Sequence, residues 1–250
     1  MIKTLLNKFK IDKAAKAISQ SKKTFILTGA GISTSAGVPA FRGSGGLWTY
    51  EELQFLTAPQ SWVLYPHKCW IAYEEYRKIV SKAQPTPAHY AIKALQDAQP
   101  VVVATTNVDS LHFKTGTVTY EIHGCLEELR CIGCKKVQEM PIQPLTTYPT
   151  CRCTAWMRHD VVLFGEEVRH VRETDIALET SDVVIFVGSS GAVTDIGEMA
   201  TWAQNNGKFV IDINTEKTPA SYYADLHIKL HADEALTKIV QKIYKLRRQK

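Results

Sequence analysis

The 250-residue sequence predicts an α/β fold, in which a Rossmann-like, doubly wound parallel sheet carries a small cysteine-rich insertion. Three observations predict it. Short apolar runs at 24–28, 101–105, 182–187 and 209–213 alternate with segments of helical periodicity. Each run ends in small or polar residues, as strands do at the ligand-binding edge of such a sheet. Two close pairs of cysteines interrupt the alternation.

The composition is typical of an ordinary soluble globular protein, with a formal net charge of +5 and six cysteines. Residues 1–10 lack the apolar core and the cleavage site of a signal peptide, and no apolar run is long enough to span a bilayer. We therefore expect a cytoplasmic protein with reduced thiols and no membrane partner. The basic tail that begins at Lys242 is more typical of a solvated helix end than of a nucleic-acid contact, so no direct nucleic-acid partner is expected.

The first strand, Thr24–Thr28, follows a predicted packing helix at 11–21 and runs into the turn Gly29-Ala30-Gly31. Residues this small let a backbone approach a phosphate group closely, which favours a nucleotide-binding loop. The turn is not the common dinucleotide fingerprint, because its third glycine, Gly37, comes three residues late. A purely structural turn remains an equal alternative.

The next segment, 55–80, has helical periodicity, many aromatic residues, and interruptions at Pro59 and Pro66. An aromatic stripe is usually part of a core, although this many rings in short helices also fit the wall of a ligand pocket. A further helix is predicted from 87 to 95.

The strand at 101–105 ends in Asn107 and Asp109. Polar side chains at this end of a parallel strand are predicted either to meet a ligand or to cap the following helix. A further strand, 118–125, would deliver His123 onto a turn at Gly124. Imidazole titrates near neutrality, so His123 at a strand end is a candidate general base as well as a possible structural histidine.

Four cysteines form two close pairs separated by sixteen residues: Cys131, Cys134, Cys151 and Cys153. This spacing predicts a single tetrahedral zinc site with four thiolate ligands. Because four protein ligands close the coordination sphere, the zinc is expected to be structural and to hold a module over 127–156. Cys69 and Cys125 lie outside this pattern and are predicted to be buried small apolar residues.

After the cysteines the alternation resumes, with strands predicted at 160–164, 182–187, 209–213 and 224–230 and helices at 171–180, 196–206 and from 233 onward. Strands separated by helices imply right-handed crossovers and a parallel sheet. Four of the strands end in turns that begin at or include Gly29, Asn107, Gly188 and Asn214. Their convergence at one edge predicts a dinucleotide crevice.

From about Ser21 onward these motifs resemble the sirtuin family, the NAD-dependent protein deacylases. The resemblance is carried by Gly29-Ala-Gly-Ile-Ser33, Phe41-Arg42 with Gly46-Leu-Trp48, Asn107-Val-Asp109-Ser-Leu-His112, Ile122-His123-Gly124, the four cysteines, Val161-Val-x-Phe164-Gly165-Glu166, Gly188-Ser-Ser190 and Asn214-x-Glu216. It implies a Rossmann-like NAD-binding domain made of residues 1–126 and 157–250, with a helical insertion at about 50–85, and a zinc-binding module at 127–156.

The resemblance also implies the chemistry: an NAD-dependent protein-lysine deacylase, most simply a deacetylase, which releases nicotinamide and O-acyl-ADP-ribose. Asn107 and His123 are the implied catalytic residues, with Asn107 and Asp109 holding the nicotinamide and its ribose and His123 acting as the base on a ribose hydroxyl. The implied NAD contacts are Gly29, Ala30, Gly31, Ala40, Phe41, Arg42, Trp48, Thr106, Asn107, Val108, Asp109, Gly188, Ser189, Ser190, Asn214, Thr215, Glu216 and Ala232. The implied contacts to the acyl-lysine substrate are Tyr73, Tyr76, Val161, Phe164, Gly165 and Glu166, with 161–166 pairing with the substrate backbone as an added strand.

Two regions depart from the family pattern. Ala40 resembles the residue at this position in the branch of the family that removes acidic acyl groups. That branch also has an arginine three residues after the tyrosine that corresponds to Tyr73, but here the arginine stands one place late, at Arg77. One residue turns a helical side chain by about a hundred degrees, which argues against a desuccinylase. Thr106 replaces the usual glutamine, and the loop after Gly188 also differs. These changes leave two alternatives open, an ADP-ribosyltransferase or NAD hydrolase and a non-catalytic NAD-sensing module.

Overall fold

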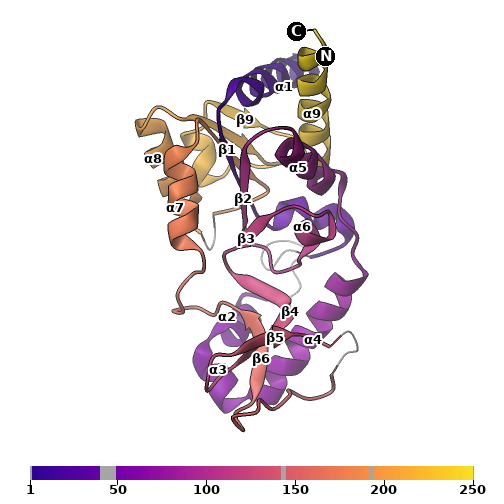
Figure 1. Ribbon diagram of the computed structural model, residues 1–250, viewed down its shortest axis with the longest axis vertical. Coiled ribbons are helices and arrows are strands. Elements are labelled where there is room, and N and C mark those ends of the chain that lie inside the picture. Colours follow the sequence, from indigo (N-terminus) through magenta and orange to yellow (C-terminus); the bar gives the residue numbers. More distant parts are fainter. Residues whose placement is uncertain (1, 40–48, 142–144, 192–193, 250) are drawn as a thin grey trace.

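The computed structural model describes residues 2–39, 49–141, 145–191 and 194–249. Figure 1 shows a larger α/β lobe, which contains both termini, and a smaller lobe at the opposite end of the molecule. Over the described residues, no helix combines the length and the apolar character needed to cross a membrane.

The larger lobe is built on a six-stranded sheet in which every pairing is parallel. The spatial order is β3-β2-β1-β7-β8-β9, so the chain starts in the middle, runs to one edge and later returns to build the other half. Its strands are β1 (Thr24–Thr28), β2 (Val101–Thr105), β3 (Thr119–Glu121), β7 (Val183–Val187), β8 (Phe209–Ile213) and β9 (Leu226–Ile228). The strand order reverses between β1 and β7, which is where doubly wound sheets place their ligands.

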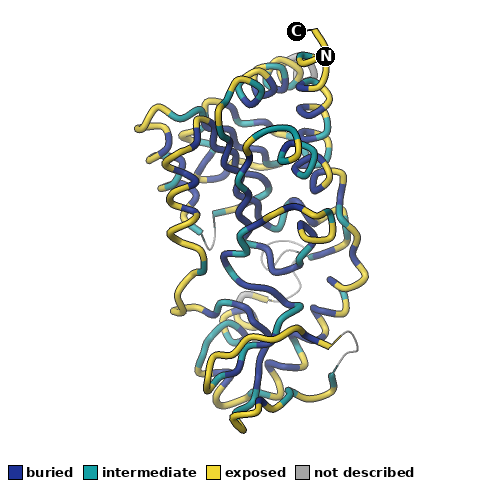
Figure 2. Tube along the Cα trace, in the orientation of Figure 1, coloured by how far each residue is buried: buried dark blue, intermediate teal, exposed yellow. Residues whose placement is uncertain are grey.

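Helices cover both faces of this sheet, as the predicted doubly wound fold requires. One face carries α1 (Ile2–Gln20), α5 (Pro87–Ala98) and α9 (Ala232–Arg248), and the other carries α7 (Val171–Thr180) and α8 (Ile196–Asn205). Side chains alternate along each strand, so Ile26 of β1 packs in the first apolar layer while Phe25 and Leu27 pack in the second. Figure 2 shows the strands buried between the two helical layers.

The register of the strands brings the predicted turns together. Thr28 at the end of β1 pairs with Thr105 of β2 and with Val187 of β7, and Val187 pairs with Ile213 of β8. The turns that follow these residues therefore lie along one edge of the sheet. This confirms the predicted convergence of the four strand ends.

The helical segment between β1 and β2 contains three helices where the sequence predicted an interrupted helix. They are α2 (Tyr50–Thr57), α3 (Pro59–Leu64) and α4 (Pro66–Lys82). Each proline is the first residue of its helix, where its missing N–H has no intrahelical acceptor to lose. The two predicted interruptions are thus the boundaries of α3 and α4.

The small lobe contains an antiparallel sheet with the order β5-β4-β6, formed by β4 (Gly124–Cys131), β5 (Val137–Glu139) and β6 (Met157–Val161). Two strand predictions were wrong here. Of the strand predicted at 160–164, only residues 160 and 161 are in a strand, and they are the end of β6, which pairs with β4 and takes no part in the parallel sheet. The strand at 118–125 is two strands, because the chain turns at Ile122 and His123 between β3 and β4. Apolar alternation alone does not say which sheet a short strand joins.

The remaining differences lie at element ends. Helix α1 begins at Ile2 rather than at 11, and β7, α8, β9 and α9 start or stop one or two residues from the predicted positions. The small sheet extends beyond 127–156 on both sides, because β4 begins at Gly124 and β6 ends at Val161, and the division of the chain into two domains remains a prediction. Trp70 of α4 packs on Cys131, Cys151 and Met157, so the helical segment and the small sheet share an apolar core.

Glycines join the turns after β1 and β7. Gly29 donates its N–H to the carbonyl of Val187 at 2.9 Å, and Gly31 donates to the carbonyl of Gly188 at 2.8 Å. A Cβ atom on Gly29 would lie 2.7 Å from the Cα of Ser189, and one on Gly31 would lie 2.7 Å from the Cα of Gly188. The two backbones touch, so these glycines are required by the fold itself.

Replacing Gly29 with alanine is expected to lower the free energy of unfolding by about 2 kcal/mol, because the added methyl group overlaps backbone that cannot yield without moving β7. The matched control is Gly207→Ala, where φ is +71° but no atom lies within 4 Å of the new Cβ. That change should lower stability by only about 1 kcal/mol. Urea unfolding measures both, and equal losses would contradict the proposed backbone contact.

Candidate functional site

Polar side chains after β2 reach across to the turn after β1. The Nδ2 group of Asn107 donates to the carbonyl of Gly29 and to Ser33 Oγ, both at 3.2 Å. Ser33 Oγ in turn donates to Asp109 Oδ2 at 2.6 Å. Asn107, Asp109 and Ser33 are all buried, so these hydrogen bonds form in a site of low polarity, where they hold the three side chains firmly.

Asp109 also performs the alternative role considered for it. Its Oδ1 atom accepts the N–H of Leu111 at 3.0 Å, at the start of the short helix α6 (Leu111–Lys114). One carboxylate oxygen therefore fixes the helix while the other meets Ser33. The neighbouring Val108 is buried in an apolar cluster. Thr106 is half-buried, and its hydroxyl donates to the carbonyl of Thr28 at 3.3 Å.

His123 lies at the junction of the two sheets, in the turn between β3 and β4. Its Nδ1 atom is 3.2 Å from the carbonyl oxygen of Thr106, and because a carbonyl only accepts, Nδ1 carries the proton. The Nε2 lone pair then faces Thr194 Oγ1 at 3.5 Å. Burial lowers the pKa of His123 below its usual 6.5, although the hydrogen bond to Thr106 opposes this shift. A neutral imidazole with a fixed tautomer is the form that accepts a proton.

The turns after β7 and β8 continue the same edge of the sheet. Ser189 is buried, Ser190 is exposed, and Asn214 Nδ2 donates to the carbonyl of Ser189 at 3.0 Å. Beyond Asn214, Thr215 and Glu216 are exposed, and Glu216 pairs with Lys229 at 3.1 Å. These residues lie along the same sheet edge as Asn107, as predicted.

The N-terminus of α9 packs against the glycine turn. Asp233 Oδ2 accepts the hydroxyl of Ser35 at 2.6 Å, and its Oδ1 accepts the N–H of Ala88 at 3.0 Å. Ala232 beside it is buried and Ala30 is half-buried. Four predicted cofactor contacts fall on Ala40, Phe41, Arg42 and Trp48, which lie outside the described residues.

The aromatic residues of α4 are core. Tyr73 is fully buried, with its ring centroid 5.3 Å from Trp62 and 5.5 Å from His159. Tyr76 is also buried, and burial together with nearby Asp109 raises the pKa of its hydroxyl. The sequence left two interpretations of these aromatic residues open, a core role and the wall of a ligand pocket. The contacts of Tyr73 support the core role.

Arg77 is paired within its own helix. It binds Glu74 through two hydrogen bonds of 2.8 and 3.1 Å, and Glu74 Oε1 lies 2.9 Å from His159 Nε2 on β6. Burial would raise the pKa of Glu74, but the hydrogen bonds from His159 and Arg77 lower it to about 2. The carboxylate is therefore ionised, and its contact with His159 joins α4 to the small sheet.

The predicted substrate segment leaves β6 and turns back at Gly165. Val161 is buried in the apolar cluster beneath α4, whereas Phe164 and Gly165 are exposed. Val162 N–H bonds to the carbonyl of His123 at 2.8 Å, and Phe164 N–H bonds to the carbonyl of Thr57 at 2.9 Å. Glu166 accepts two hydrogen bonds of 2.5 and 2.7 Å from Arg158, so its carboxylate shapes the segment. The segment thus spans from the candidate base to α2.

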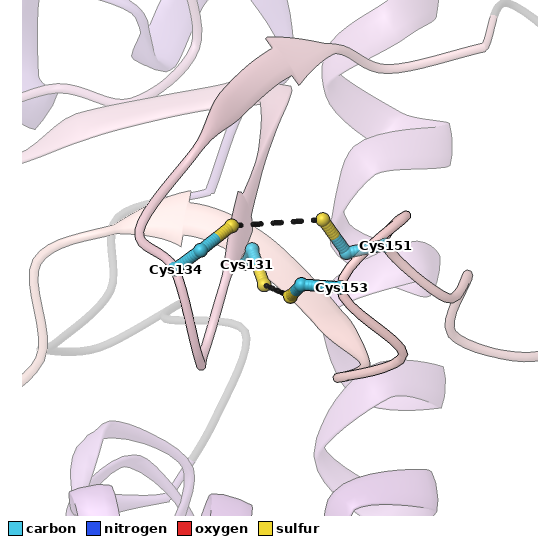
Figure 3. A group of neighbouring side chains, drawn as sticks. All are labelled: Cys131, Cys134, Cys151 and Cys153. Atoms are coloured by element: carbon cyan, nitrogen blue, oxygen red, sulfur yellow. Dashed lines mark hydrogen bonds between the residues drawn. The ribbon is translucent and has the colours of Figure 1, made fainter.

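The four cysteines of the small lobe point at one another, as Figure 3 shows. Cys131 and Cys153 sulfurs are 3.4 Å apart, Cys134 and Cys151 sulfurs are 3.7 Å apart, and all four lie within 4.8 Å of one another. A zinc ion bonded to four thiolates at 2.3 Å spaces their sulfurs at about 3.8 Å. Both knuckles turn through a left-handed residue directly after their second cysteine, Lys135 and Thr154. The set fits a structural zinc ion.

The other two cysteines are buried, as predicted. Cys69 lies in the apolar core of the small lobe. Cys125 also makes polar contacts, because its sulfur is 2.9 Å from Ser110 Oγ and accepts the N–H of Glu127 at 3.3 Å. The prediction of a buried small apolar residue is therefore confirmed for Cys69 and only partly correct for Cys125.

Sequence reasoning missed two residues of the site. Ser33 was named only as the last residue of the glycine motif, and no local pattern marks it as the link between Asn107 and Asp109. Thr194 is 71 positions from His123, and only the folded chain brings its hydroxyl to Nε2.

Comparisons of the sequence and of the structure with known proteins point to one family. Residues 29–195 match the family model described as "Sir2 family". "NAD-dependent protein deacylase 2" of Pyrobaculum aerophilum is 35% identical over 237 residues, which cover 92% of this chain and 94% of that protein. A solved complex of a Sir2 homologue mutant with ADP-ribose has a TM-score of 0.88 and 32% identity, covering 95% of this chain and 98% of its own. A solved complex of a Sir2 protein with a myristoylated histone peptide has a TM-score of 0.79 and 30% identity, covering 97% and 100%.

The protein is expected to hold about one zinc ion per chain, and Cys134→Ser should lose it. Structural zinc contributes on the order of 10 kcal/mol to folding, so we expect this variant to lose about 5 kcal/mol of stability. Metal analysis and thermal unfolding give the two readings, with Cys69→Ala as the control that removes a buried thiol outside the cluster. A Cys134→Ser protein that is metal-free yet as stable as the parent would show that the site is not structural.

Proposed function

The chain belongs to the Sir2 family, the sirtuins, and we propose that it is an NAD-dependent protein-lysine deacylase. The relative named above is a deacylase that depends on NAD, and solved relatives bind ADP-ribose and an acylated peptide. In the proposed reaction, the acyl group of a lysine passes to the ADP-ribose part of NAD. One molecule of water is consumed, and the products are nicotinamide, the deacylated lysine side chain and O-acyl-ADP-ribose.

The observation that carries the proposal is the state of His123, which bonds to the carbonyl of Thr106, the residue before Asn107. Its Nδ1 proton is held by the Thr106 carbonyl, so Nε2 is the acceptor and cannot rotate away without losing that bond. A base in this position removes the proton of a ribose hydroxyl, which then attacks the acyl carbon. Lowering the pKa by burial keeps the imidazole neutral when the substrate arrives.

Asn107 and Asp109 orient the substrate NAD in this proposal. Bound NAD supplies a ribose carbon that accepts the acyl oxygen as the bond to nicotinamide breaks. The proposed contacts to the nicotinamide end are Thr106, Asn107, Val108 and Asp109, and the adenosine end is assigned to Gly188, Ser189, Ser190, Asn214, Thr215, Glu216 and Ala232. The phosphates are assigned to Gly29, Ala30, Gly31 and Arg42, and Ala40, Phe41 and Trp48 remain proposed NAD contacts.

We further propose that the acyl group is neutral, as an acetyl group is. Recognition of a succinyl carboxylate needs a cation that can bind it, but Arg77 already forms an ion pair with the buried carboxylate of Glu74. Freeing Arg77 would leave the Glu74 carboxylate buried without its ion pair, which is unfavourable. Tyr73, Tyr76, Val161, Phe164, Gly165 and Glu166 remain the proposed substrate-side residues, and the last three of them are exposed.

The proposal is tested by incubating the protein with NAD and one peptide sequence that carries acetyl-, succinyl- or long-chain acyl-lysine. Mass spectrometry should show nicotinamide release in step with peptide deacylation, with acetyl removed at least about tenfold faster than succinyl. Release without deacylation would instead indicate an ADP-ribosyltransferase or NAD hydrolase, and NAD binding without release would indicate a sensing module. Either result contradicts the deacylase.

His123→Ala should lower kcat for deacylation by about a thousandfold while NAD binding stays within about twofold, because the base acts in chemistry more than in affinity. His170→Ala, an exposed histidine, is the control and should keep full activity. Because the pKa of His123 is lowered, its neutral form persists into acid. The acidic limb of kcat/KM should therefore fall at a pH below 6.5, and a limb at higher pH would contradict the assignment.

A further inference from the structure

The segments that carry the two catalytic groups are joined by a set of contacts outside the catalytic residues themselves. Residues 105–111 follow β2, and residues 121–127 run from the end of β3 into β4. Backbone hydrogen bonds join them at both ends, from Ile122 N–H to the Thr105 carbonyl at 3.0 Å and from Leu126 N–H to the Val108 carbonyl at 3.1 Å. Between these bonds, three side chains meet: Glu121, Ser110 and Cys125.

Ser110 has an unusual backbone for its residue type. Its φ is +53° and its ψ is +17°, in the left-handed region that residues other than glycine seldom adopt. Such a conformation persists only where the surroundings hold it. Here the Ser110 hydroxyl lies 2.9 Å from the Cys125 sulfur, and both groups are near enough to the Glu121 carboxyl group to lower its pKa.

The three groups are mutually dependent because the cluster is largely closed to water. Cys125 is buried, and Ser110 and Glu121 are half-buried. Burial, Glu128 and Asp109 raise the pKa of Glu121 to about 7, while burial and Glu121 raise the pKa of the Cys125 thiol to about 12. A thiol in this state serves as a hydrogen-bonding group and not as a nucleophile.

We propose that Glu121, Ser110 and Cys125 form a positioning cluster that holds Asp109 and His123 in register for acyl transfer. Ser110 directly follows Asp109, and Cys125 stands two residues after His123, so the cluster fixes the separation between the NAD-binding carboxylate and the base. This inference rests on the proposed function. A small misplacement of reacting groups lowers the rate of the chemical step much more than it lowers binding.

The test compares Cys125→Ala, Ser110→Ala and the double variant in the full-length, zinc-loaded protein. Each single change is expected to lower kcat for deacylation about tenfold while KM for NAD moves less than about twofold. The double variant should lose no more than either single variant, because each change breaks the same contact. Losses that multiply, or a Cys125→Ala protein with the parent's kcat, would overturn the proposal.

Three further variants separate positioning from folding. Cys125→Ser keeps a hydrogen-bonding group at the position and should recover kcat to within about threefold of the parent. Ser110→Gly removes the hydroxyl but favours the left-handed backbone, so it should fold well and still show the loss of kcat. Cys69→Ala removes a buried thiol outside the cluster and should leave kcat unchanged. Recovery by glycine but not by serine would show that only the backbone conformation matters, against the proposal.

The imidazole of His123 reports on the cluster independently of turnover. Its ring nitrogen resonances in ¹⁵N NMR should show a protonated Nδ1 in the parent and a mixture of tautomers in Cys125→Ala. Unchanged resonances would overturn the cluster even if the parent deacylates peptides. A parent that does not deacylate would overturn the proposed function alone, and the NMR comparison would still decide the cluster.

Discussion

The contact between the turns after β1 and β7 is the constraint on which the candidate site depends. Gly29 and Gly31 press their backbones against Gly188 and Ser189, and the pair is held by hydrogen bonds to the carbonyls of Val187 and Gly188. β1 and β7 are the strands at which the sheet order reverses. The contact between the two turns therefore fixes the strand ends of both halves of the sheet at one edge. Asn107 hydrogen-bonds to the first of these turns.

A second constraint joins the chemistry to the small lobe. His123 stands where the parallel sheet ends and the antiparallel sheet begins, with Nδ1 bonded to the Thr106 carbonyl and its own carbonyl accepting the N–H of Val162. The small sheet is held by the four cysteines at its far end and by the buried Glu74 pair with Arg77 and His159 near α4. Stabilising the small lobe thus also stabilises the position of the base.

Much of this site was predictable because its residues are marked by local rules. Strand ends carry Gly29, Asn107, Gly188 and Asn214, and parallel pairing alone aligns them. Cysteine spacing predicted the metal cluster, and the prolines predicted the ends of the helices in the inserted segment. The strand at 160–164 was misplaced because its apolar pattern suits either sheet, and only its pairing with β4 decides between them.

By itself, the sequence determined the doubly wound fold, the zinc ligands and the candidate base, because each depends on periodicity, spacing or residue chemistry within a short window. Only the tertiary structure decided the rest. It showed that the glycines meet a second backbone turn, that Ser33 links Asn107 to Asp109, and that Arg77 is taken up by Glu74. The glycine and Ser33 contacts join residues that lie far apart in the sequence. Arg77 and Glu74 stand on one helix, but the burial of their pair and its contact with His159 of β6 come only from the fold.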